Sequence, residues 1–342
     1  MKLRKIIAIA GIAFLFNNAF GATSSSELKN DLSSALTDMS NSMLEEFETI
    51  LPQSNSLLSV QPDAYIGKLL PSIPPHFAVG LNFSVTPVTV DFISDNIDKV
   101  TDVIKGIDGF DGNLAFDLPI SGKLPYPAAA INARVGGLFL PFDVGVNAVT
   151  TGSIFNDKSF GDKLSLDFNY TSAGFDLRYA VLEGNGLLPK ISLGGGYQFV
   201  RQQIGFGFSN SFEADIDAEH SADVYTSADV NLKIDTHTVF AQIQVSKTLL
   251  IFTPYIGLKA MFTTANCAYD WNYNTKLNGN PFPQLSDRAS DSYKDTVADI
   301  GIQTQVFGGL SLNLAVFQTS FNAAYNFSSK LFTGAIGLAI KL

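Results

Sequence analysis

Charged and amide side chains recur at every second position along several apolar stretches of this chain. Arg134 follows Asn132 by two residues, and Arg178 follows Asp176 in the same way. Residues two apart in an extended strand share a face, so each pair would project from one side of a sheet. On an enclosed face, guanidinium and carboxylate groups can form ion pairs or select passing ions by charge. These four residues are the first candidates for chemistry.

Metal and cofactor chemistry has weaker support. The acidic run 213–219, followed by His220, offers hard oxygen ligands for a divalent cation. The run lacks the glycine turn of a calcium loop, and a solvated surface loop is the simpler interpretation. Cys267 is the single cysteine, which excludes a disulfide framework and a cysteine metal site. We predict no metal and no cofactor.

The elements that carry the polar positions alternate with period two, which indicates β-strands. In the first of them, 77–85, Phe77, Val79 and Leu81 face one way and Ala78 and Gly80 the other. The same alternation predicts ten strand segments in all: 77–85, 131–136, 144–148, 175–181, 191–199, 239–246, 255–262, 298–306, 317–325 and 331–342.

The connections between these segments alternate in length. We expect short links at 138–143, 183–189, 247–252 and 308–313, and long loops at 208–236 and 267–295. Short periplasmic turns and long extracellular loops are typical of bacterial barrels. Alternation within 224–234 also suggests strands that extend beyond the bilayer. The fold class predicted is all-β, a closed antiparallel transmembrane β-barrel of about ten strands within a range of 8–14, covering 76–342.

The polar residues at alternate strand positions must point into the barrel, because a charged side chain that faces lipid at the midplane costs about 2–4 kcal/mol. The predicted lumen-lining residues are Asn132, Arg134, Asp176, Arg178, Gln198, Gln242, Gln244, Lys259, Asp299, Gln303, Gln305, Gln318 and Asn322. Two interpretations stay open: a hydrogen-bonded filling, in which both arginines pair with Asp176 and Asp299, or an open or gated passage.

The N-terminal region does not read as strand. Lys2, Arg4 and Lys5 precede an apolar run that is too short to span a membrane, and residues 1–21 are expected to be a cleaved signal peptide. Within 22–75, apolar residues at three- and four-residue spacing predict an amphipathic helix over 27–51 that Pro52 ends, followed by a proline-rich stretch. This segment could plug the lumen, pack on the periplasmic rim or bind a partner. A second helix is expected at 91–107.

The last strand places Phe332, Ile336, Leu338, Ile340 and Leu342 on one face. It resembles the C-terminal insertion signal of bacterial outer-membrane β-barrels. The resemblance implies an outer-membrane location, contact with outer-membrane lipid and recognition by the barrel-assembly machinery through this strand. The segment ahead of the barrel resembles the hatch of fatty-acid transporters of the FadL type.

Composition narrows the function further. The formal net charge of −10 argues against nucleic-acid binding, which needs a basic surface. Neither the acid and Asp–His pairs of outer-membrane proteases nor the Ser–His–Asn arrangement of outer-membrane phospholipases is present around His76, His220 or His237, so we predict no enzyme. Two functions remain: a porin-like or gated channel for small or hydrophobic solutes, and a structural or adhesin-like barrel that acts through loops 208–236 and 267–295.

Overall fold

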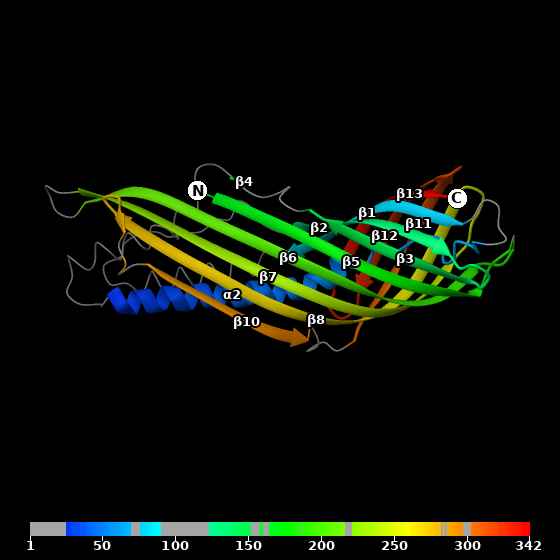
Figure 1. Cartoon of the computed structure of the whole chain (residues 1–342), viewed down its shortest axis with the longest axis horizontal. Coiled ribbons are helices and arrows are strands. Elements are labelled where there is room, and N and C mark those ends of the chain that lie inside the picture. Colours follow the sequence, from blue (N-terminus) through cyan, green and yellow to red (C-terminus); the bar gives the residue numbers. More distant parts are fainter. Residues whose placement is uncertain are drawn as a thin grey trace.

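The computed structural model of this protein describes one antiparallel sheet that closes on itself (Figure 1). The described residues are 25–69, 76–89, 123–151, 158–159, 164–185, 187–215, 221–281, 283, 286–296 and 302–342. The expected signal peptide, the expected helix at 91–107, His220 and Asp299 lie outside these ranges.

Ten strands form the closed ring, and each is antiparallel to both neighbours. They are β1 (Phe77–Thr89), β2 (Lys123–Gly136), β3 (Phe142–Thr150), β5 (Leu164–Leu182), β6 (Lys190–Asp215), β7 (Ser221–Ser246), β8 (Phe252–Leu277), β11 (Gln303–Leu314), β12 (Phe317–Asn326) and β13 (Phe332–Lys341). Strand β1 closes the ring against β13, from the pair Ala78–Lys341 to the pair Val85–Gly334. Each of the ten predicted segments overlaps one of these strands, so the predicted barrel is confirmed.

Three shorter strands lengthen the wall on one side. Strand β4 (Lys158–Ser159) pairs with β5, while β9 (Asn280–Pro281) and β10 (Asp287–Thr296) pair with β8. Strands β6, β7 and β8 each have 26 residues. The prediction of long loops over 208–236 and 267–295 is therefore wrong for most of these residues. Their backbone groups are hydrogen-bonded in continuous ladders, and the extension of 224–234 as strand is confirmed.

The two halves of these long strands have opposite polarity. In the C-terminal half of β7, Val239 is 58% exposed on the outside, while Gln244 is buried on the inside. Beyond His237 the polarity reverses: Lys233 is exposed outside and Leu232 is buried inside. Only the half with apolar outward residues, 237–246 in β7, can face lipid. Its roughly ten residues, at ~3.3 Å each and tilted by ~40°, span about 25 Å, the height of the apolar band of membrane barrels.

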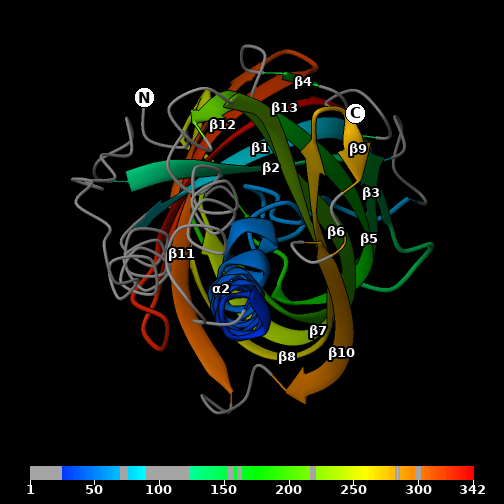
Figure 2. The ribbon, with the colours of Figure 1, turned by 90° about the vertical axis from the view of Figure 1, so that its left-hand side faces the viewer.

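Helix α2 (Ser25–Asn55) lies inside the ring of strands (Figure 2). It begins at the end where β6, β7 and β8 protrude and runs toward the end that carries the short turns (Figure 1). The prediction that Pro52 ends the helix is wrong. The helix continues to Asn55, and in this last turn the side chains of Ser54 and Asn55 donate to the Leu51 carbonyl at 3.0 and 2.7 Å and satisfy it. No helix within the described ranges has the length and apolar character that crossing a membrane requires.

Candidate functional site

An ion-pair network lies in the lumen at the level of the lipid-facing belt. Arg134 contacts Asp143 at 2.5 Å and Asp176 at 2.6 Å, and Arg178 contacts Asp143 at 2.8 Å. All four side chains are at most 3% exposed. The predicted pairing of Arg134 with Asp176 is confirmed. Asp143 is a partner that the sequence analysis missed, although it shares the inward parity of the other buried positions of β3.

Inward-facing glycines make room for this network. A Cβ atom on Gly145 would lie 2.4 Å from Nη2 of Arg134, and one on Gly194 would lie 2.8 Å from Cγ of Arg178. Real Cβ atoms essentially never approach other atoms so closely, so any larger residue at Gly145 would displace the Arg134 guanidinium. The glycines of the wall therefore serve close packing against charged side chains.

The segment after α2 is fixed to the wall through Asp63. Its carboxylate lies 2.6 Å from Nζ of Lys341 and 3.4 Å from Nζ of Lys190, and it accepts from the Gln318 amide at 3.1 Å. The Asp63 carbonyl accepts from Arg178 Nη1 at 2.8 Å. A single buried residue therefore joins the irregular segment to β5, β6, β12 and β13.

Further polar contacts follow the same segment through the lumen. Lys259 donates to the Ser56 carbonyl at 2.6 Å, with its ammonium 4.6 Å from the Phe240 ring centre. The Gln61 side chain donates to Asn132 at 2.7 Å. We call α2 and residues 56–66 the plug, because together they fill the lumen of the described barrel.

The protruding half of the barrel holds the plug by apolar contacts instead. One hydrophobic cluster joins Leu44 and Phe47 of α2 to Leu232, Ile234 and other inward residues of β7 and β8. Trp271, 2% exposed, belongs to the same cluster. The lumen thus has two zones, an apolar one beyond the belt and a polar one within it.

Twelve of the thirteen predicted lumen-lining residues are described, and all twelve are buried. Asp299 lies outside the described residues, so its predicted pairing with an arginine stays a prediction. Besides the contacts above, Gln198 donates to Ser172 at 2.7 Å, Gln303 accepts from Asn326 at 3.2 Å, and Gln244 donates to the Gln61 carbonyl at 2.7 Å.

Several inward amides have no hydrogen-bond partner among the described residues. Both side-chain polar atoms of Asn147, Gln202 and Gln305 are unpaired there, as is Oε1 of Gln242. An unsatisfied buried polar group costs about 1–3 kcal/mol. The wall therefore offers more hydrogen-bonding groups than the plug pairs with.

The other chemical candidates stay apart from this network. The ring of His237 faces outward at the edge of the belt, where its Nδ1 lies 2.6 Å from the Tyr197 hydroxyl. The acidic run 213–219 continues from β6 into residues outside the described ranges. Within the described part of the chain, no three His, Cys, Asp or Glu side chains come together as metal ligands.

Comparison with known proteins gives similarity at the level of the fold. No protein-family model and no curated protein matches the chain. The translocator domain of the autotransporter NalP from Neisseria meningitidis is 7% identical, with 91% of this chain and 98% of that chain covered and a TM-score of 0.33. The outer membrane protease OmpT from Escherichia coli is 11% identical, with 79% of this chain and 97% of that chain covered and a TM-score of 0.36. The Ralstonia pickettii toluene transporter TbuX is 10% identical, with 78% of this chain and 88% of that chain covered and a TM-score of 0.23.

Proposed function

We propose that this protein is a gated channel of the outer membrane for small polar solutes, with the plug as its gate. The observation that carries the proposal is the contrast between the two zones of the lumen. Beyond the belt, the interior is closed by apolar packing against α2. Within the belt, the interior is lined by Arg134, Arg178, Lys259 and amides.

A barrel that only had to be closed would have no need of a polar interior. Buried ion pairs are often no more stable than well-packed apolar residues of similar volume. The amide of Gln305, which has no hydrogen-bond partner among the described residues, adds a further cost in the closed form. A polar wall favours the state in which the plug has moved and solvated solute occupies the lumen. Charges of both signs favour small polar solutes over apolar ones.

The test locks the plug to the wall. Ser84 Oγ lies 2.6 Å from the Ser54 carbonyl oxygen, and both side chains are fully buried. The contact brings the Ser84 side chain against the backbone of Ser54, the proximity that a disulfide between the two positions first requires. We expect Ser54→Cys with Ser84→Cys, made in a Cys267→Ser background, to abolish channel events in planar bilayers when oxidised. Reduction should restore them.

The Cys267→Ser protein with Ser84→Cys alone is the matched control and should conduct in both redox states. A wild-type protein that never conducts, with or without residues 22–75, would remove the channel proposal. The outer-membrane location and the cleavage of 1–21 belong to the same proposal. Fractionation of cell envelopes and N-terminal sequencing of the mature chain test them separately.

A further inference from the structure

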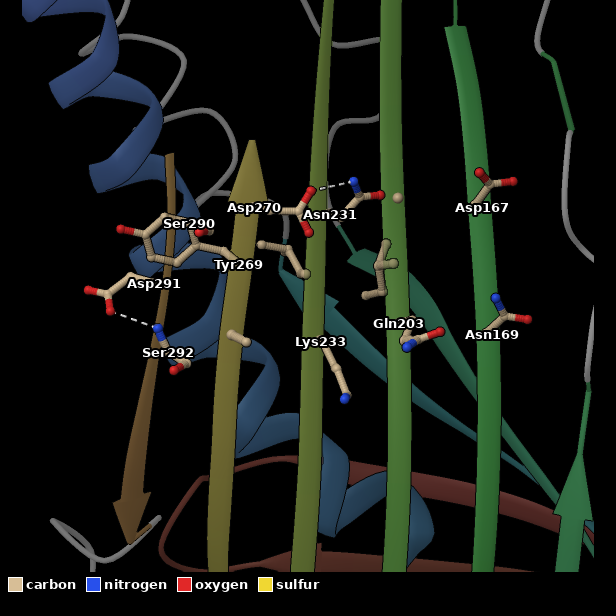
Figure 3. A pocket seen from close by; sticks show the side chains of 14 residues that line it. Asp167, Asn169, Gln203, Asn231, Lys233, Tyr269, Asp270, Ser290, Asp291 and Ser292 are labelled. Atoms are coloured by element: carbon tan, nitrogen blue, oxygen red, sulfur yellow. Dashed lines mark hydrogen bonds between the residues drawn. The ribbon is translucent and has the colours of Figure 1, made fainter. Parts of the chain in front are cut away.

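A hollow of about 690 Å³ lies on the outer face of the protruding strands, away from the plug (Figure 3). Two successive cross-strand rows of residues form it. The first row is Asp167, Gly205, Asn231, Asp270 and Ser290, and the second is Asn169, Gln203, Lys233, Ala268 and Ser292. Five strands, β5, β6, β7, β8 and β10, contribute one residue each to both rows. With neighbouring strands ~4.8 Å apart, each row is about 19 Å long.

A residue without a side chain helps to form the hollow. Gly205 has no side chain, and a Cβ atom there would lie 3.0 Å from Oδ1 of Asn231. Asn231 in turn donates to Asp270 at 2.9 Å, which orients both groups (Figure 3). Behind this surface, Ile204 and Leu232 pack into the cluster that contains α2. The polar groups are thus held on a rigid sheet, as a preorganised binding site requires.

The chemistry of the lining favours a ligand with many hydroxyl groups. Amides supply donors and acceptors, carboxylates accept, and Ser290 and Ser292 do both. Three carboxylates, those of Asp167, Asp270 and Asp291, outnumber the one ammonium and disfavour a polyanion.

The neighbouring carboxylate Asp229 shows the same crowding of negative charge. Burial, and then the charge of Asp270, raise its pKa above the ordinary value, against a hydrogen bond from Asn272. A cation site is not built here, since the described residues bring no three acidic side chains together as ligands.

We propose that this hollow binds neutral carbohydrate through its hydroxyl groups. The site lies about 10 Å beyond the last apolar row of the belt, four residues along a tilted strand from His237 to Lys233. It faces sideways, along the membrane surface. The sugar could therefore belong to a glycolipid of the same membrane or to a free polysaccharide, which share the same hydroxyl chemistry. The site stands apart from the lumen, so it does not depend on conduction.

The test is binding of the full chain in detergent to an array that holds neutral and sulfated glycans. We expect retention by neutral glycans and none by heparin fragments. Asn231→Ala with Asp270→Ala should weaken binding about tenfold or more, because two oriented hydrogen-bonding groups are lost. Gly205→Gln fills the hollow without removing any polar group and should abolish binding. Asn274→Ala, an exposed amide of β8 outside the hollow, is the matched control and should bind as wild type does.

Vesicles of phosphatidylcholine that carry a neutral glycolipid distinguish the two sources. Binding to the vesicles as well as to the array identifies a sugar of the membrane, whereas binding to the array alone identifies a free polysaccharide. A gel-mobility comparison before and after boiling shows that each variant is folded. Failure of every neutral glycan to bind would overturn the proposal. Stronger binding of heparin fragments than of neutral glycans, or equal binding by the Gly205→Gln and wild-type proteins, would also overturn it.

Discussion

At the scale of the residue, Asp63 is the group on which closure of the belt zone most depends. Its carboxylate neutralises Lys190 and Lys341, whose side chains are 28% and 27% exposed, and is itself 2% exposed. If Asp63 lost its charge, both ammonium groups could turn to water at little cost, whereas the plug would lose its polar anchor. The contact therefore stabilises the closed state more than the barrel itself.

We predict that Asp63→Asn raises the open probability in planar bilayers about tenfold, since a loss of ~1.4 kcal/mol of closed-state contact shifts a two-state equilibrium by that factor. Glu183→Gln is the matched control. It breaks the exposed pair of Glu183 with Lys68 at 2.9 Å, which contributes ~0–1 kcal/mol, and should leave the open probability unchanged. An Asp63→Asn protein that opens no more often than wild type would show that Asp63 does not hold the gate.

The sequence predicts part of this network. Period-two alternation places Arg134, Asp176 and Arg178 on the inward face, because the face on which a strand residue lies follows from its immediate neighbours in sequence. The Arg178–Asp143 contact depends on the stagger between β3 and β5, which one strand alone does not reveal. Asp63 lies in an irregular segment without periodicity, so nothing in its neighbourhood indicates where it points.

At the scale of the element, the long strands show why the sequence predicts long loops where the structure has strand. Beyond His237 the period of two continues, but the outward positions become polar, as in Asn231 and Lys233. A search for apolar outward positions stops at that reversal. The physical cause is that the surroundings of the strand change on both faces. The outer face passes from lipid to water, and the inner face passes from the polar belt zone to the apolar face of α2. The reversal itself therefore marks the edge of the membrane.

The short turns at the other end mark the opposite edge. Phe139 is 70% exposed, Leu187 92% and Leu250 98%, one on each of three different turns. These tips continue the apolar belt, and a belt of about 25 Å needs every residue from His237 to the turn. We infer that the turns reach into the interfacial layer of the inner leaflet instead of standing in water.

A single tryptophan can report this depth, because Trp271 is the only one in the chain. In a Trp271→Phe background, we predict that Leu250→Trp fluoresces with a blue shift in vesicles and is quenched by brominated lipid. Lys233→Trp in the same background lies beyond the other edge of the belt and should be quenched little. Equal quenching at the two positions, or none at Leu250→Trp, would contradict the placement of the membrane.

At the scale of the whole molecule, the barrel and the plug are held together by different forces in the two zones. The backbone hydrogen bonds of the ring run between strands and do not involve the plug. The belt zone should therefore survive without α2, whereas the protruding strands would expose the inward row of Val230, Leu232, Ile234 and Trp271 to water. At ~25 cal/mol per Å² of apolar surface, that exposure would weaken the protruding half selectively.

We predict that deleting 25–66 leaves a barrel whose gel mobility still changes on boiling, but whose protruding strands become sensitive to trypsin. Lys233 and Lys276 lie in those strands, so cleavage there, mapped by mass spectrometry, should increase greatly relative to the full chain. Lys259, buried in the belt zone, is the internal control and should stay protected in both proteins. Loss of the boiling-dependent shift, or cleavage at Lys259 as fast as at Lys233, would show that the plug supports the whole barrel and cannot act as a separable gate.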